Sequence, residues 1–443
     1  MDQTRSRFEY MTVTPVPRLI CRLAVPTILS MLVTGLYNAA DTFFVGKLST
    51  QATAAVGLVF SVMAMIQAVG FFCGQGSGSY ISRMLGAGRR QEASEIAATG
   101  FALSLILGVA AAILGNVLAR PLAFAIGARA TTIHDTLVYM RIILIGAPFM
   151  MAQFVVNNQL RFQGSAMYAM VGLLTGAFLN IALDPLLISV FHMGVAGAAI
   201  ATVSGQFVSF VVLLVGSRKG DNIRLKISNV CFSRLYLKEI INCGSPALFR
   251  QGLAAVSVLM LNHAAGSLGG DAAIAGMSVV TRALMLLSSA LIGFGQGYQP
   301  VCGFNYGAGL YQRVSRAFKF SVAVSTAYCS AVAAAGIVFA DAIVSLFSVA
   351  DADVISLGAL VLKFHCSTYI LNGFIVLTNM YLQTTRHTAG ALLVAVARQG
   401  LFFLPLLVVG AHFYGLMGIV AAQPLSDVLT FVLAVVMVRR FKI

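Results

Sequence analysis

The sequence predicts an all-α polytopic membrane protein whose twelve transmembrane helices form two parallel six-helix lobes, with both termini in the cytoplasm. Three observations lead to this fold class. Of the 443 residues, 59% are hydrophobic and only 10% are charged, whereas a soluble domain devotes about a quarter of its residues to charge. The apolar residues occur in long blocks, and one glycine-rich motif occurs twice. A chain with so few charges cannot cover itself with a polar surface.

The apolar blocks define the expected helices. A helix needs about 20 apolar residues to cross a hydrocarbon core of roughly 30 Å. We expect spans at residues 19–45, 54–81, 94–115, 136–156, 165–190, 194–216, 240–265, 272–302, 317–339, 354–382, 388–410 and 416–437. The basic N-terminal segment runs directly into the first block, which is too long for the apolar region of a signal peptide, so no cleaved leader is expected.

The basic residues indicate the orientation of these spans. The formal net charge is +15 at pH 7, which in a soluble chain would suggest nucleic acid. With a cytoplasmic N-terminus, however, only Lys47, Arg120 and Arg129 of the 29 basic residues fall in outer loops, and most of the others lie in inner segments. This is the positive-inside pattern, and it also suits an anionic inner leaflet. We therefore expect a multi-pass protein of the inner or plasma membrane, with lipids and no nucleic acid as partners.

A duplicated motif reveals an internal repeat. The stretch GQGSGSYISRMLGAGRRQ begins at Gly74, and the similar stretch GQGYQPVCGFNYGAGLYQ begins at Gly295. Likewise MGVAGAAIA from Met193 parallels YGLMGIVAA from Tyr414. A repeat unit with an even number of spans enters the membrane in the same direction each time. The two halves should therefore be related by a pseudo-twofold axis along the membrane normal.

The repeat divides the chain into an N-lobe (1–216), a basic cytoplasmic linker (217–239) and a C-lobe (240–443). Two such halves are expected to enclose a central site and to rock about it, as in a transporter. The motif is not expected to bind nucleotide, because no strand precedes it and the chain has no GxxxxGK[ST] sequence. No cofactor is expected.

Two acids inside the first half are candidate ion-coupling residues. Asp41 lies in YNAADTFFVG of span 1 and Asp184 in FLNIALDPLL of span 5, both in the outer half of the membrane. An ionisable residue in a span costs about 2.5–3.5 kcal/mol on insertion scales, so it indicates a function. Tyr37 lies one turn from Asp41, and Asn180 one turn before Asp184 on the same helix face. Pro185 removes a backbone donor and is expected to act as a hinge beside the acid.

Two interpretations of these acids stay open. They could accept hydrogen bonds that fix helix packing, or burial and mutual repulsion could let at least one of them take up and release a proton. Carboxylate, amide and hydroxyl oxygens also suit Na⁺, with Asp41, Asp184 and Asn180 as ligands. The coupling ion is thus H⁺ or Na⁺, and Asn157 and Thr202 offer further polar groups.

The second half has a different set of charges. It lacks an acid at the matching positions of span 7 and carries Arg250, Asn372 and Arg398, with Asp427 in span 12. Asp427 is the expected counter-ion of Arg398 or Arg250. Alternatively, these cations contact an anionic group on a substrate or lipid.

The motifs YNAADTFFVG, NNQLRFQG, NIALDP and GFNYGAG resemble the multidrug and toxic compound extrusion (MATE) family over essentially the whole chain. The linker and the missing second-lobe acids are similar to the branch of DNA-damage-inducible and staphylococcal-type exporters. In the sodium-dependent branch, acids in the first and fourth helices of the second lobe bind Na⁺. Ala255 and Asn372 stand at the corresponding places here.

The first-lobe acid pair of archaeal and related bacterial members matches Asp41 and Asp184, with Asn157, Asn180 and Thr202 beside them. The resemblance implies the MATE-type fold and an antiporter that exports amphipathic cationic compounds by alternating access in exchange for H⁺ or Na⁺. We expect a monomer. The alternative is a lipid-linked oligosaccharide flippase of the same superfold. No enzyme is expected: an intramembrane aspartyl protease would need a GxGD motif, which is missing, and paired lobes argue against a passive channel.

Overall fold

The computed structural model describes residues 7–46, 48–345 and 352–441, apart from the side chains of 36–43, 46, 50, 269–275 and 352–353. All regular structure in this part of the chain is helical. In the first half the helices are α1 (Arg7–Val13), α2 (Val16–Gly46), α3 (Thr50–Gly86), α4 (Arg90–Val117), α5 (Ala119–Ala125), α6 (Ile133–Phe162), α7 (Ala166–Pro185), the π-helix η1 (Leu186–Val190) and α8 (Gly194–Ser217).

A 3₁₀ turn, η2 (Ile227–Asn229), lies in the linker. The second half consists of α9 (Arg234–Gly307), α10 (Tyr311–Val338), α11 (Ala340–Ser345), α12 (Ala352–Thr384), α13 (Thr388–Val396), the π-helix η3 (Ala397–Leu401) and α14 (Phe403–Arg440). Serine side chains cap two of the long helices: Ser49 accepts from the Ala52 amide at the start of α3, and Ser233 from the Tyr236 amide at the start of α9.

The described residues contain eleven segments that are long and apolar enough to cross a membrane. The last of them, Thr388–Arg440, has 53 residues and would measure about 80 Å as one helix, far more than a bilayer core of roughly 30 Å. Gly415 breaks it with φ 57° and ψ −135°. Gly410 and Gly418 then face each other across the turn. This segment therefore supplies two crossings, and the prediction of an all-α membrane protein with twelve spans is confirmed.

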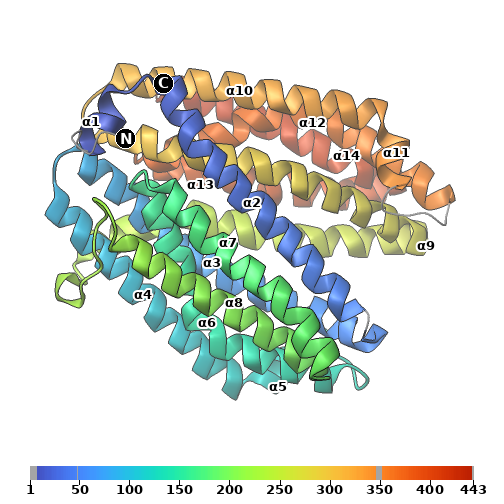
Figure 1. The fold of residues 1–443 in the computed structure, drawn as a ribbon. Helices are drawn as coiled ribbons and strands as arrows, with labels where there is room; N and C mark the ends of the chain where they lie inside the picture. The colour runs from blue at the N-terminus through green and yellow to red at the C-terminus, as the bar shows by residue number, and fades with distance from the viewer. Residues whose placement is uncertain (1–6, 47, 346–351, 442–443) are drawn as a thin grey trace.

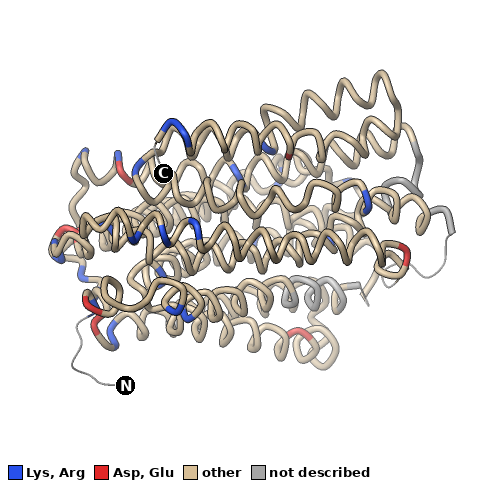
Figure 2. Tube along the Cα trace, turned by 90° about the horizontal axis from the view of Figure 1, so that it is seen from above, with Lys and Arg blue, Asp and Glu red and all other residues tan. Residues whose placement is uncertain are grey.

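The charges mark the two ends of the molecule. Both ends of the chain lie at the same end of the helix bundle (Figure 1). Lys and Arg gather at this end, and few of them lie elsewhere (Figure 2). By the positive-inside rule this is the cytoplasmic end.

The two halves of the chain lie on different sides of the bundle. Helices α4 to α8 form one side, α9 to α14 form most of the other, and α2 runs obliquely across them (Figure 1). Each half has its own apolar core: one lies among α3, α5, α6 and α8, and another among α9, α11, α12 and α14. We keep the names N-lobe for residues 1–216 and C-lobe for 240–443.

The duplicated motif lies where the lobes meet at the cytoplasmic end. A methyl group on Gly86, the last residue of α3, would clash with the backbone carbonyl of Phe304 in α9. Reciprocally, a methyl group on Gly307, the last residue of α9, would clash with the backbone carbonyl of Arg83 in α3. The repeat thus exists because each lobe presents the same helix end to the other, and only glycine allows backbones to approach so closely.

An ion cluster joins the lobes at the same place. Glu239 of α9 accepts from Arg83 of α3 at 2.8 Å and from Arg386, in the α12–α13 loop, at 2.6 Å. Arg83 also donates to the Thr384 carbonyl at 3.0 Å. The side chains of Arg83 and Glu239 are each only 4% exposed, whereas that of Arg386 is 63% exposed. The structure is therefore closed on the cytoplasmic side.

We expect Glu239→Ala to lower the thermal unfolding midpoint of the detergent-solubilised protein clearly. Removing one partner of a buried pair leaves an uncompensated charge, which costs about 3–5 kcal/mol, and here that charge is on Arg83. Arg386→Ala removes the exposed partner from the same acid and serves as the control, because exposed pairs contribute only about 0–1 kcal/mol. Equal effects of the two substitutions would contradict the buried pair.

Candidate functional site

One face of α7 carries the candidate site. Its buried residues Gly172, Gly176, Asn180 and Asp184 recur every four positions and thus form one stripe. A methyl group on Gly176 would lie 2.5 Å from the Gly205 carbonyl of α8, so the small residues bring these two helices close together. The close packing buries the polar residues of the stripe, and Asp184 is 0% exposed.

Pro185 changes the helix immediately after the acid. The α-helix ends at Pro185 and the chain continues as the π-helix η1. A proline has no amide hydrogen to donate, and π-helical turns in membrane helices commonly accompany functional positions. Asp184 is therefore next to a local irregularity that can change conformation more easily than a regular helix.

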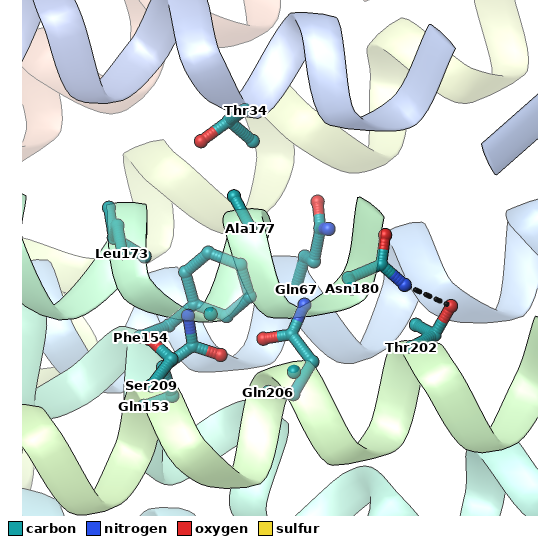
Figure 3. Close-up of a pocket in the computed structure, with 12 residues that line it drawn as sticks. Thr34, Gln67, Gln153, Phe154, Leu173, Ala177, Asn180, Thr202, Gln206 and Ser209 are labelled. Carbon is teal, nitrogen blue, oxygen red and sulfur yellow. Dashed lines mark hydrogen bonds between the residues drawn. The ribbon is translucent and has the colours of Figure 1, made fainter. Parts of the chain in front are cut away.

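A small cavity lined by both polar and apolar residues opens beside this stripe, between α2, α3, α6, α7 and α8 (Figure 3). Its volume is about 30 Å³, enough for one or two water molecules or a small ion and far below the roughly 300 Å³ of a drug pocket. At one side of the cavity the Asn180 amide donates to the Thr202 hydroxyl at 3.4 Å. The lining consists of Thr34, Gln67, Gln153, Phe154, Leu173, Gly176, Ala177, Asn180, Thr202, Gly205, Gln206 and Ser209.

Oxygen acceptors dominate the polar lining. Four buried oxygens have no hydrogen-bond partner among the described residues: Gln153 Oε1, Asn180 Oδ1, Gln206 Oε1 and Ser209 Oγ. Buried acceptors of this kind normally have a partner, and amide and hydroxyl oxygens are suitable ligands for a hard cation. No group of three or more His, Cys, Asp or Glu in the described part of the chain could hold a metal ion, so a cation here would depend largely on neutral oxygens.

The structure places the other predicted N-lobe residues as follows. Asn157 of α6 donates to the Ala169 carbonyl of α7 at 3.0 Å, so it ties these helices together and is absent from the cavity lining. Asp41 and Tyr37 belong to α2, but their side chains lie outside the described residues. Of the lining residues that the site prediction omitted, Ser209 lies one turn beyond Gln206 on α8. That spacing is a signal for a shared face.

The C-lobe residues form a separate cluster. Asp427 of α14 accepts from Arg398 Nε of η3 at 2.9 Å, from Gln423 at 3.0 Å and from Asn372 of α12 at 3.3 Å. The side chain of Arg398 is 28% exposed and that of Asp427 only 4%. Arg250 instead donates to Asn379 at 3.3 Å. Of its two candidate partners, Arg398 and Arg250, Asp427 therefore pairs with Arg398.

The family model described as MatE matches residues 26–186 and 246–409 of the chain. Two similar proteins are both described as "Multidrug export protein MepA". The one from Staphylococcus haemolyticus (strain JCSC1435) is 28% identical over 420 residues, 94% of this chain and 91% of that protein. The one from Staphylococcus aureus (strain NCTC 8325 / PS 47) is 27% identical over 434 residues, 97% of this chain and 95% of that protein.

Solved structures are similar over nearly the full length. The "Crystal structure of MATE in complex with MaL6" gives a TM-score of 0.92 at 26% identity, over 99% of this chain and 100% of that one. A second, described as "Outward-facing conformation of a multidrug resistance MATE family transporter of the MOP superfamily", gives 0.91 at 26% identity, over 99% of both chains. A third, from Pyrococcus furiosus, gives 0.90 at 26% identity, over 99% of both, and its description reads "Reverse polarity of binding pocket suggests different function of a MOP superfamily transporter".

Proposed function

Because the chain belongs to the MatE family, we propose that it exports amphipathic cationic compounds from the cell by alternating access, in exchange for H⁺ or Na⁺. The protein is a multi-pass protein of the plasma membrane, and its relatives are transporters and not enzymes. The names of the MepA relatives, which cover nearly all of this chain, support multidrug export.

The buried Asp184, one turn from Asn180 of the cavity lining, is the observation that supports ion coupling best. Ionisable residues inside membrane spans are rare and mark ion or substrate pathways. Asn180, one turn before Asp184, and Thr202, which accepts from Asn180, offer neutral oxygens in the cavity. We infer that the coupling ion binds to Asp184 together with these groups and with Asp41 and Tyr37 of α2. Asn157 supports the site by fixing α7 to α6.

The small size of the cavity supports binding of the ion there, with the exported compound bound elsewhere. A drug-sized cation needs roughly ten times the 30 Å³ measured here. The compound would therefore bind where the lobes face each other, and ion loading at Asp184 would act on it through rearrangement of α2 and of the Pro185–η1 segment. Release of the ion to the cytoplasm would follow opening of the cytoplasmic interface.

The driving force for export depends on how many H⁺ are exchanged for each compound. Exchange of one H⁺ for one monovalent cation moves no net charge, so it draws only on the pH gradient, at about 1.4 kcal/mol per pH unit. Two H⁺ per compound would add roughly 2.3 kcal/mol per 100 mV of membrane potential.

An ion-replacement experiment tests the proposal. Proteoliposomes loaded with a fluorescent cation are studied at fixed pH with external Na⁺ or choline, and separately at constant Na⁺ with and without a pH gradient. If H⁺ is the coupling ion, export depends on the pH gradient and does not change when choline replaces Na⁺. If Na⁺ is the coupling ion, export falls when choline replaces Na⁺ and does not depend on the pH gradient. Export that responds to neither gradient would contradict antiport.

Lipid-linked oligosaccharide transport is the second candidate. The basic residue Arg250, which is bonded to Asn379 and to no carboxylate among the described residues, favours an anionic cargo. The pairing of Arg398 with Asp427 works against it, because this pair removes one positive charge from the C-lobe. The same proteoliposomes with a fluorescent lipid phosphate in place of the cation distinguish the two.

A further inference from the structure

The C-lobe repeats the helices that line the N-lobe cavity. The start of α8 and the second part of α14 share the repeat MGVAGAAIA and YGLMGIVAA, and the second residue of each copy is a glycine with positive φ: 56° at Gly194 and 57° at Gly415. Continuing this register, the cavity-lining Thr202 corresponds to Gln423 and Gln206 corresponds to Asp427.

The neighbouring helices keep the same correspondence. In the N-lobe, Asn157 donates to the carbonyl of Ala169, twelve residues later, and in the C-lobe Asn379 donates to that of Ala391, also twelve residues later. These two bonds align α7 with the α13–η3 segment.

Seven residues beyond each accepting alanine lie Gly176 and Arg398. Both contact equivalent positions of the facing helix: Gly176 approaches the carbonyl of Gly205, and the carbonyl of Arg398 accepts from Ser426 at 2.7 Å. At the position where the N-lobe has a glycine of the cavity lining, the C-lobe therefore has an arginine.

We propose that the Arg398 guanidinium is a tethered cation that fills the C-lobe counterpart of the N-lobe ion cavity. This inference rests on the proposed function in so far as the N-lobe cavity binds the coupling ion. The group that holds the guanidinium is a cation ligand: the Asp427 carboxylate accepts from Nε at 2.9 Å, and the amides of Gln423 and Asn372 in turn donate to this carboxylate. The C-lobe thus carries a permanent internal cation and loads no ion of its own.

Removing the tethered side chain should expose a binding site for a free monovalent cation, best of all one with the planar donor geometry of guanidinium. The route to the site exists already, because the side chain of Arg398 is 28% exposed. Asp427 would hold the free cation as it holds Arg398 now.

The test uses methylguanidinium as probe and the purified full-length protein carrying Asp184→Asn, so that the N-lobe site contributes nothing. Arg398→Gly, which copies Gly176 of the N-lobe, is compared with Arg398→Lys, which keeps a tethered cation, and with the double substitution Arg398→Gly/Asp427→Asn. Binding is followed by calorimetry and by the thermal unfolding midpoint at constant ionic strength with choline as the balancing salt.

We expect saturable binding to Arg398→Gly at least tenfold tighter than to the parent or to Arg398→Lys, and its loss in the double variant. Equal behaviour of Arg398→Gly and the double variant would overturn the proposal. If Arg398→Gly does not fold alone, recovery of the folded protein by methylguanidinium supports the tethered cation, and lack of recovery refutes it. Because transport is not measured, failure of the N-lobe proposal leaves this result unaffected.

Discussion

Asp184→Asn should abolish ion-driven accumulation while the protein stays folded and inserted. Asparagine keeps the shape of the side chain but carries no charge and exchanges no proton, so the buried position no longer loads a coupling ion. With one H⁺ exchanged per compound, a gradient of two pH units supplies about 2.7 kcal/mol and supports a concentration ratio of roughly 100. In the variant this ratio should fall to about 1, measured with a fluorescent cation in energised inverted vesicles.

A control substitution of an acid outside the site shows whether the effect is specific to Asp184. Asp341 of α11 pairs with Lys363 at 3.3 Å, and both side chains are largely exposed. Asp341→Asn therefore removes a carboxylate without touching the cavity and should leave accumulation unchanged. Wild-type accumulation by Asp184→Asn, at equal amounts of inserted protein, would show that this acid does not couple the ion to the compound.

Much of the site could be predicted from spacing along single helices. Asn180 and Asp184 lie one turn apart on α7, and the structure puts both on the buried stripe that faces α8. Thr202, in the expected span 194–216, accepts from the Asn180 amide. Helical periodicity decides which side chains of one helix share a face, so residues of this kind can be read from the sequence.

Contributions from other helices could not be predicted in the same way. Thr34 of α2 and Gln67 of α3 line the cavity, but their participation depends on how far each helix is shifted along its neighbours. Asn157 illustrates the same problem, since the register of α6 against α7 directs its amide to the Ala169 carbonyl. Packing between helices sets this register, and hydropathy does not encode it.

Charge pairing was predictable only as a set of alternatives. Asp427 had two candidate partners in the sequence, and the geometry of η3 selects Arg398. Glu239 lies in the charged stretch that was assigned to the linker, yet α9 already begins at Arg234 and buries this side chain against Arg83. A helix that extends beyond the membrane continues through charged residues, so low hydropathy did not mark its true start.

We expect Gly86→Ala and Gly307→Ala, at the cytoplasmic interface between the lobes, to open the cytoplasmic side of the protein. Replacing a helical glycine by alanine normally stabilises a helix by about 0.5–1 kcal/mol. Here the new methyl group would clash with a backbone carbonyl of the other lobe, Phe304 or Arg83, which cannot rotate away. Overpacking of this kind costs roughly 1–3 kcal/mol, so the closed state should lose a factor of about 5 to 150 in population.

Cys243 reports on this opening. It is 0% exposed, and its sulfur lies 3.8 Å from the guanidinium of Arg83 at the interface. In a background without the exposed Cys21 and Cys231, a membrane-impermeant maleimide added from the cytoplasmic side should modify Cys243 about tenfold faster in either glycine variant, as measured by peptide mass spectrometry. Cys329, buried in the apolar core around α10, should stay unmodified in every variant.

Gly252→Ala provides the matched control, because this glycine lies in α9 as well but has no atom within 4 Å of the added methyl group. It should leave Cys243 as protected as in the wild type. If Gly86→Ala and Gly307→Ala also leave it protected, the closed interface tolerates the methyl groups, and close backbone approach would not be the reason for the repeated motif. If only the two interface variants expose it, each lobe contributes half of one cytoplasmic closure, as the reciprocal contacts of α3 and α9 require.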